Sequence, residues 1–207
     1  MKTSTLIKAT SLTIQLEERK IIDSSSFTIN EGDFLNLVGM NGAGKSVLIQ
    51  HLIKQRRSSS IDFIKGIKIS YIPQEVFFVE EVSQIFNDYT LIFKAKKSRA
   101  ALIKSFTLEP LMSKKWEELS SGEMQRVLLA IAFMKKPNII ILDEWAKNLD
   151  VVATNESVAL LKNLRKKNPK IAFLFVTHKE SLMNSISKDH GKLVISDKII
   201  LKVGSNE

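Results

Sequence analysis

The sequence predicts an α/β fold that combines a mostly parallel sheet, an N-terminal antiparallel β portion and a helical insertion. Short, almost wholly apolar runs at residues 34–38, 139–142 and 171–176 are typical of strands buried on both faces of a parallel sheet. A helical stretch, residues 153–167, separates the last two runs, as in a crossover connection. Between about residues 80 and 136 the composition becomes helix-prone and rich in Lys, Glu, Leu and Ala, which indicates the insertion.

Composition limits the classes of protein that this chain can belong to. Its 207 residues, 44% of them hydrophobic, suffice for one core, with or without a small insertion. The longest apolar run, Val127–Met134, has eight residues, whereas a membrane span needs roughly 18–20, and the N-terminus shows no secretory signal. The lack of cysteine excludes disulfides and thiolate metal sites and suits a cytosolic protein. The net charge of +9 indicates an acidic partner, which could be nucleic acid, anionic lipid or protein.

The first part of the chain is predicted to consist of strands arranged around one helix. Apolar patterning places these strands at residues 5–16, 26–29, 34–39 and 67–72. The helix follows residue 44, because apolar side chains recur there at helical spacing. In the insertion, Pro110 and the residues around Ser120 interrupt the helical pattern.

A glycine-rich turn joins the strand at residues 34–39 to this helix. Gly-x-x-x-x-Gly-Lys-Ser between a strand and a helix is the arrangement of a P-loop, so we expect a P-loop NTPase (RecA-like) core. The glycines let backbone N–H groups converge on phosphate oxygens, Lys45 reaches the β- and γ-phosphates, and Ser46 offers a hydroxyl to Mg²⁺. A chance match in a glycine-rich turn is the alternative. The predicted phosphate-binding residues are Gly39, Asn41, Gly42, Ala43, Gly44, Lys45, Ser46 and Val47.

Two adjacent acids, Asp143 and Glu144, end the buried run that begins at Asn138. In open α/β sheets, ligands bind at the carboxyl ends of the strands. In nucleotide hydrolases of this type the Asp anchors the Mg²⁺ shell, and a following Glu can orient or deprotonate the attacking water. The alternative is a strand that simply ends in an acidic turn.

A third motif precedes the helix that leads into this strand. Ser120, Ser121, Gly122 and Glu123 form a capping-box pattern, in which the serine at the N-cap and the glutamate at N3 satisfy each other's backbone groups. By itself the pattern predicts only that a helix starts at Ser120 and runs to about Lys135.

Together with the P-loop and the acid pair, Leu119-Ser120-Ser121-Gly122-Glu123 resembles the signature peptide of ATP-binding cassette (ABC) ATPases, the nucleotide-binding subunits of ABC transporters. The resemblance covers nearly the whole chain, and three further motifs occur in the family's order. Gln74 lies at the position of the Q-loop glutamine, Asn148-Leu149-Asp150 at that of the D-loop, and His178 at that of the switch histidine.

The resemblance implies one ABC nucleotide-binding domain over residues 1–207, with an α/β core at 1–75 and 138–207 and a helical subdomain at about 76–137. It implies ATP and Mg²⁺ as cofactors, with Ser46, Gln74 and Asp143 around the metal. Glu144 would act on the attacking water, and His178 would steady the γ-phosphate. The signature residues Ser120, Ser121, Gly122 and Glu123 would face ATP on a second copy or a paired cassette. Asp150 would belong to the D-loop, which would contact the P-loop of that partner.

The resemblance also implies a transmembrane permease subunit as partner and a peripheral location on the cytoplasmic face of the inner (plasma) membrane. Mg-ATP binding would join two cassettes, and hydrolysis would release them. Phe77 and Phe78, just after Gln74, are expected either in the core or in an apolar groove that receives a helix of the permease.

The sequence departs from the family pattern at four positions. Ser121 replaces a glycine of the signature, Glu123 replaces the common glutamine, and Trp145 replaces the proline that usually follows the glutamate. Leu16 stands where an aromatic residue commonly stacks on adenine. Lost stacking would weaken base binding by about 1–3 kcal/mol, or roughly 5- to 150-fold in affinity, so we expect the phosphates to carry most of the binding.

Two other functions stay open at this point. A non-transport ABC-type ATPase could act on nucleic acid, on ribosomes or in cofactor assembly, and a small P-loop kinase would carry an acceptor-binding lid in place of the signature. Nucleic acid is not favoured as a partner, because no motif resembles a nucleic-acid reader. The basic stretches at residues 93–99 and 161–170 are expected to be solvated helix faces, and His51 and His190 have no companions at metal-ligand spacing.

Overall fold

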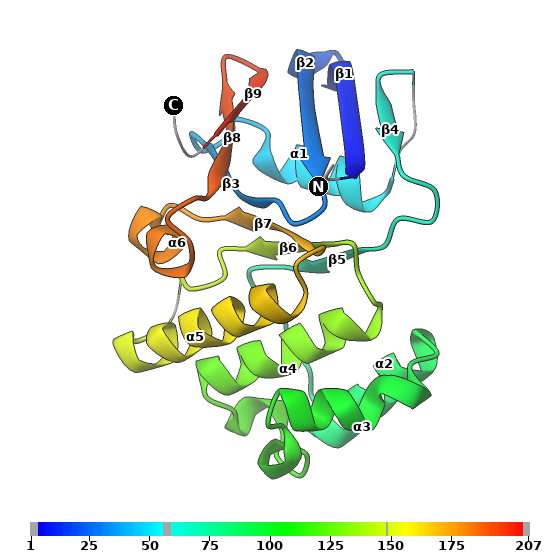
Figure 1. Ribbon diagram of the computed structural model, residues 1–207, viewed down its shortest axis with the longest axis vertical. Coiled ribbons are helices and arrows are strands. Elements are labelled where there is room, and N and C mark those ends of the chain that lie inside the picture. Colours follow the sequence, from blue (N-terminus) through cyan, green and yellow to red (C-terminus); the bar gives the residue numbers. More distant parts are fainter. Residues whose placement is uncertain (1–3, 56–58, 148, 205–207) are drawn as a thin grey trace.

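A computed structural model describes residues 4–55, 59–147 and 149–204. A six-stranded sheet forms its centre, in the order β5-β6-β7-β3-β8-β9 (Figure 1). All neighbouring strands in it are parallel except β8 and β9, which form an antiparallel hairpin. The strands are β3 (Phe34–Gly39), β5 (Ile69–Ile72), β6 (Ile139–Asp143), β7 (Ala172–Val176), β8 (Gly191–Ser196) and β9 (Ile199–Val203).

A second, antiparallel sheet is built from the N-terminal part of the chain. Its order is β2-β1-β4, with β1 (Thr5–Leu16), β2 (Arg19–Asn30) and β4 (Ile61–Phe63). The register of β1 on β2 shifts at several points, which is the mark of β-bulges in two long strands. This sheet and α1 (Lys45–Ile53) lie on one side of the central sheet (Figure 1).

Helices cover the opposite side of the central sheet. In Figure 1, α4 (Ser121–Met134) and α5 (Val151–Lys167) lie next to the sheet, and α2 (Val82–Ile92) and α3 (Lys96–Ser105) lie beyond α4. Two short 3₁₀ turns, at Glu109–Leu111 and Trp116–Glu118, connect α3 to α4. Helix α6 (Glu180–Ile186) links β7 to β8.

Two hydrophobic clusters fill the two sides of the central sheet. Alternate residues of β6 take part in different clusters, with Ile140 on the α4–α5 side and Ile141 on the α1 side. This alternation follows from the two-residue period of a strand. It explains why β6 and β7 contain almost no polar residues, since both faces of these strands are covered.

The α/β fold class predicted from the sequence is confirmed, and helices occupy the stretch between β5 and β6. Three predicted strand positions match β1, β3 and β5 to within two residues, and the strand expected at residues 26–29 is longer, running from Arg19 to Asn30. The elements β4, α6, β8 and β9 were not predicted. Throughout the described residues, no helix combines the length and the apolar character that crossing a membrane would require.

Candidate nucleotide-binding site

The loop between β3 and α1 has the backbone geometry of a phosphate cradle. Gly44 is the N-cap of α1 and has φ 106°, a region that L side chains rarely adopt. A Cβ there would come within 2.6 Å of the Ile21 side chain. Gly42 has φ 79° and an open surrounding, with nothing within 4 Å of an added Cβ. The glycines therefore permit the turn and leave room for a ligand against the backbone.

Lys45 folds back over this loop. Its Nζ donates to the carbonyl oxygens of Gly39 at 2.6 Å and Met40 at 3.1 Å. The first turn of α1 contains no acidic residue and has no side-chain cap, so its leading N–H groups are available to an anion. Lys45, the loop backbone and the helix N-terminus thus direct positive potential at one place.

Cavities flank the loop on both sides. One, of about 260 Å³, is lined by residues that include Leu16, Ser46 and Val47. The other, of about 290 Å³, is lined by residues that include Asn41 and Gly42. Leu16 is 49% exposed. Leu16, at the predicted base position, therefore lines a space beside the P-loop.

Asp143 ends β6, and its carboxylate is held by a neighbouring strand. The hydroxyl of Tyr71, on β5, donates to Asp143 Oδ2 at 3.0 Å. Burial raises the pKa of Tyr71, and the negative charge of Asp143 and this hydrogen bond raise it further, so the phenol stays protonated as a donor. Gln74 is exposed and follows β5, whose Ile72 pairs with Leu142.

The side-chain oxygens of Ser46, Asp143 and Gln74 suit Mg²⁺ better than a metal ion that is held by protein ligands alone. No group of three His, Cys, Asp or Glu side chains that could hold a metal occurs among the described residues. Mg²⁺ is usually bound by one or two carboxylates plus phosphate oxygens and water. A hydroxyl on Ser46, a carboxylate on Asp143 and an amide on Gln74 are therefore a fitting set of donors when a nucleotide supplies the phosphates.

Glu144 and His178 lie near each other. The distance from His178 Nε2 to Glu144 Oε1 is 3.8 Å, and the side chains are 62% and 20% exposed, respectively. Glu144 has φ 48°, a left-handed backbone that is uncommon for a non-glycine residue. Its N–H donates to the carbonyl of Val176 at 2.8 Å. The strand pairing thus continues by one residue before the chain turns and presents the carboxylate.

The strand order explains why these motifs converge. β7 lies between β3 and β6, and the three strands run parallel. Their carboxyl ends therefore lead, side by side, into the P-loop, His178 and the Asp143–Glu144 pair. A buried asparagine on β3 ties down the segment that leads to His178. Asn36 donates to the Thr177 carbonyl at 3.2 Å and accepts from the Thr177 N–H at 3.3 Å.

The segment after Glu144 is held by side chains that the sequence analysis did not select. Gln125, on α4, donates to the carbonyl of Trp145 and accepts a hydrogen bond of 2.7 Å from the hydroxyl of Ser157, on α5. Lys179 donates to the carbonyl of Ala146 at 2.6 Å. Both residues are adjacent to motifs, Gln125 just after the signature and Lys179 just after His178, and that proximity was the only available signal.

The predicted capping box is present at the start of α4. The Ser120 N–H donates to Glu123 at 2.8 Å, and the Glu123 N–H donates to the Ser120 hydroxyl at 3.2 Å. Lys114 adds a 2.9 Å ion pair to Glu123. Partial burial acts to raise the pKa of Glu123, but the hydrogen bonds from Ser120 and the Lys114 ammonium outweigh it and lower that pKa. Ser121 is exposed, and Gly122 is buried against Ala153.

Asp150 is the N-cap of α5, where its carboxylate accepts from the Ala153 N–H at 2.7 Å. Asn148, the first residue of the predicted D-loop, lies outside the described residues. Trp145, at the position of the family's proline, is 5% exposed and belongs to the cluster on the α4–α5 side. Its indole nitrogen is buried and has no hydrogen-bond partner among the residues that the structure describes.

The structure does not bring the signature to the P-loop of the same chain. Figure 1 shows α1 and α4 on opposite sides of the central sheet, and their buried residues belong to different clusters. The P-loop, the acid pair and His178 form one site, and Ser120 to Glu123 form a separate surface at the N-terminus of α4.

Comparisons with known proteins agree with this arrangement. The family model described as "ABC transporter" matches residues 22–147. The zinc import ATP-binding protein ZnuC of Vibrio cholerae is 33% identical over 178 residues, which cover 84% of this chain and 67% of that protein. ZnuC 1 of Hahella chejuensis is 30% identical over 162 residues, which cover 77% of this chain and 64% of that protein.

Among solved structures, cbiO1 from Clostridium perfringens, described as part of the ABC transporter complex cbiONQ, superposes with a TM-score of 0.83. The identity is 22%, and the match covers 98% of this chain and 89% of that one, so it supports the fold. The chain spans about two thirds of the length of the two curated relatives. The family match and these identities show that the chain belongs to the ABC transporter family, as an ATP-binding subunit.

Proposed function

We propose that the chain is one ABC nucleotide-binding domain that binds and hydrolyses Mg-ATP and thereby powers a membrane transporter. The observation that carries this proposal is the convergence of the P-loop, His178 and the Asp143–Glu144 pair at the carboxyl ends of three neighbouring strands. A phosphate cradle, an acid pair and a histidine at one edge of a sheet are the parts that nucleotide hydrolysis needs. The helices of residues 76–137 would form the domain's helical subdomain.

The P-loop would hold the phosphates of ATP, and three side chains near it would hold the magnesium ion. Backbone N–H groups from Gly42 to Val47, with Lys45, hold the phosphates, and this requires Lys45 to exchange its contacts to Gly39 and Met40 for phosphate oxygens. When bound, Mg²⁺ offsets phosphate charge. Ser46, Asp143 and Gln74 are the residues that would hold it. Tyr71 orients the Asp143 carboxylate through its hydroxyl.

The proton-transfer role falls to Glu144. Its side chain is only 20% exposed and lies beside His178, which is more open. A carboxylate in this position can accept a proton from the attacking water, while the imidazole contacts the γ-phosphate. The left-handed turn at Glu144, with carbonyl contacts from Gln125 and Lys179 just beyond it, keeps the carboxylate at the sheet edge.

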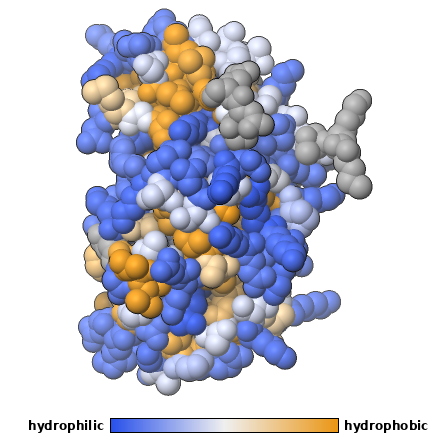
Figure 2. All heavy atoms as spheres, turned by 60° about the vertical axis from the view of Figure 1, so that its left-hand side comes forward, coloured by the Kyte–Doolittle hydropathy of each residue, from blue (hydrophilic) through white to orange (hydrophobic). Residues whose placement is uncertain are grey.

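A dimer would complete the site. The signature and the P-loop are on opposite sides of one chain's sheet, so a second copy or a paired cassette would have to supply the signature to the bound ATP. At the start of α4, the N–H groups of Ser121 and Gly122 have no acceptor within the helix, which suits an anion. Val151 and Val152, at the start of α5, are 76% and 69% exposed. Figure 2 shows several separate apolar areas with hydrophilic surface between them on one face of the molecule.

The proposed membrane partner is a permease subunit. The two phenylalanines that follow Gln74 differ in their exposure to solvent. Phe78 packs edge-on against Trp116 with ring centroids 4.9 Å apart, whereas the side chain of Phe77 is 82% exposed. Val79 is 86% exposed as well. An apolar surface directly after the Q-loop can receive a helix of the permease and place the chain at the cytoplasmic face of the membrane. The zinc import relatives favour this function over the non-transport alternative.

The test is a pull-down of the tagged chain from detergent-solubilised membranes, using Phe77→Asp and a matched control, Leu201→Asp. Leu201 is 56% exposed on β9, away from the Q-loop. Phe77→Asp should lose the membrane partner and keep ATP binding, and the control should keep both. Membrane association that is equal in all three proteins, together with strongly salt-dependent RNA or DNA binding by the purified chain, would favour the non-transport alternative.

A further inference from the structure

A cavity of about 520 Å³ lies in a different part of the structure from the P-loop site. It is bounded by the turn between α2 and α3 and by the end of α4. Lys68 precedes β5, and Lys135 and Lys136 precede β6, so the cavity lies at the amino ends of these strands. The P-loop, Asp143 and His178 follow the carboxyl ends of the parallel strands. The cavity is therefore not part of the nucleotide-binding site.

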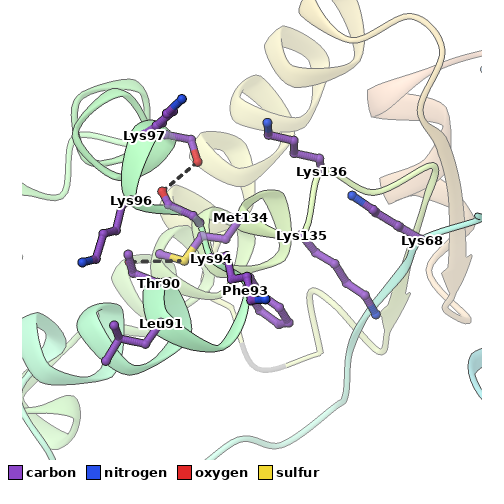
Figure 3. A pocket seen from close by; sticks show the side chains of 12 residues that line it. Lys68, Thr90, Leu91, Phe93, Lys94, Lys96, Lys97, Met134, Lys135 and Lys136 are labelled. Atoms are coloured by element: carbon purple, nitrogen blue, oxygen red, sulfur yellow. Dashed lines mark hydrogen bonds between the residues drawn. The ribbon is translucent and has the colours of Figure 1, made fainter.

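Lysine is the most frequent residue in the lining of this cavity. Among the described residues, no acidic residue lines the cavity. The lysines that line it are Lys68, Lys94, Lys96, Lys97, Lys135 and Lys136. Figure 3 shows Lys96 and Lys97 on one side and Lys68 and Lys136 on the other, with the last two extending toward the turn that carries the first two. We call these six residues the lysine pocket.

The charges of the lysine pocket are not compensated within the described part of the chain. None of its six lysines takes part in an ion pair there. Lys135 donates to the carbonyl of Ile69 at 2.6 Å, a neutral acceptor. Burial lowers the pKa of Lys135, and the neighbouring positive charge of Lys68 lowers it further. The charges of Lys68 and Lys135 therefore oppose each other, and an anion bound between the walls of the cavity would reduce this repulsion.

The N-terminus of α3 opens into the same cavity. Ala95, the N-cap, gives no side-chain cap, and Lys96 and Lys97 occupy the first turn, which has no acidic residue. Cations are unfavourable at this end of a helix, because the macrodipole is positive there. The leading N–H groups of α3, a helix of ten residues, have no acceptor within the helix. Lys96 and Lys97 therefore add two positive charges at the positive end of the helix dipole, and an anion bound there would be favoured by both.

We propose that the lysine pocket binds a multiply charged, phosphate-bearing anion. Lysine binds phosphate as a point charge, and helix N-termini bind phosphate through N–H groups, so both kinds of donor on these walls suit the same chemical group. The phosphate can belong to a soluble polyphosphate or to the headgroup of an anionic lipid. Leu91, which lines the cavity, and Ile92 beside it are 63% and 66% exposed, and a lipid would use these apolar contacts whereas a soluble polyphosphate would not.

The experiment compares two double variants of the full-length chain, each losing two exposed lysines. Lys96→Ala/Lys97→Ala alters the lysine pocket, and Lys166→Ala/Lys167→Ala, at the end of α5, is the matched control. The probes are inorganic tripolyphosphate and vesicles of phosphatidylglycerol, with phosphatidylcholine vesicles as the neutral reference. Because tripolyphosphate also suits the P-loop, binding is read at the pocket itself, as protection of Lys68 and Lys136 from acetylation measured by mass spectrometry with the P-loop saturated by ATP.

Protection should appear with one of the two phosphate probes at physiological salt, and the pocket variant should weaken that binding by about tenfold, as expected for the loss of two exposed ion pairs. The control variant should bind within about twofold of the natural chain. Protection by tripolyphosphate identifies a soluble ligand, and protection by phosphatidylglycerol vesicles alone identifies a lipid headgroup. Equal weakening in both variants would mean that net charge alone causes the binding and would overturn the proposal. Protection by neither phosphate probe, or equal protection by phosphatidylcholine vesicles, would overturn it as well.

Discussion

Gln125 is expected to be the main link between the signature helix and the segment that follows Glu144. Replacing it with leucine keeps the volume and the helical preference but removes both hydrogen bonds of the amide, the one to the Trp145 carbonyl and the one from the Ser157 hydroxyl. Ser157 and Trp145 are both buried. The change therefore leaves a buried carbonyl and a buried hydroxyl without their partner.

The expected cost follows from these two orphaned groups. A buried polar group left unsatisfied costs about 1–3 kcal/mol, so the two groups orphaned by Gln125→Leu should lower the free energy of unfolding by about 2–6 kcal/mol. For a chain of this size that corresponds to a fall in Tm of about 4–24 °C. Ser157→Ala removes one hydrogen bond together with its donor, and should cost only about 1 kcal/mol.

The assay is urea unfolding of the nucleotide-free chain, with both single variants and the double variant. The double variant has no Ser157 hydroxyl to leave without a partner. Its loss of unfolding free energy should therefore be about 1 kcal/mol smaller than the sum of the losses in the two single variants. Strictly additive effects, or a cost of Gln125→Leu below about 0.5 kcal/mol, would show that the amide does not bridge α4, α5 and the segment after Glu144.

Further predictions concern pH and nucleotide choice. The pKa of Glu123 in the folded chain is below its ordinary value of 4.5. The stability that the ionised Glu123 contributes should therefore be complete above pH 4.5 and be lost as the pH falls through the lowered pKa. In acid unfolding, Glu123→Gln should lose less stability than the natural chain over this pH range. GTP should compete nearly as well as ATP for the natural chain, and Leu16→Tyr should tighten ATP binding by about 5- to 150-fold. Calorimetry that finds a strong preference of the natural chain for ATP would mean that another side chain stacks on the base.

The sequence alone could predict the parts of the fold whose patterns are local. The buried runs that became β3, β6 and β7 are apolar because α4 and α5 cover one face of the sheet and α1 with the antiparallel sheet covers the other, so their composition carries the signal. β8 and β9 gave no such signal, since exposed and buried residues mix in them and β8 is fixed by pairing with the distant β3. β4 is only three residues long, too short for any periodicity.

The candidate site also combines features that neighbouring residues determine with features that only contacts in the folded chain determine. Motif spacing predicted the P-loop, the acid pair and the capping box, because each of them is a pattern of neighbouring residues, and the family resemblance added His178. The contacts of Gln125, Lys179 and Tyr71 depend on which carbonyl or carboxylate lies opposite in the folded chain, and spacing holds no information on that. The departure at Leu16 could be read from the sequence, but the cavity beside it could not.

The basic stretches show how a sequence pattern can have two meanings. The stretch at residues 161–170 includes Lys166 and Lys167, which are exposed at the end of α5 as expected of a solvated face. In the stretch at residues 93–99, Lys96 and Lys97 are also exposed, yet they line a cavity with lysines that are distant in the chain. Only the return of the chain at the end of α4 brings Lys136 to the same place.

The most direct test of nucleotide-driven pairing is the molar mass of Glu144→Gln in saturating Mg-ATP. This variant should keep ATP binding, because the P-loop is untouched, and lose about 10²–10⁴-fold in turnover, because the general base is absent. The bound γ-phosphate should then hold two chains together. Light scattering should give twice the 23.4 kDa of one chain with Mg-ATP and the single mass with Mg-ADP. A single-chain mass at saturating Mg-ATP, with ATP binding measured in the same sample, would contradict a homodimer.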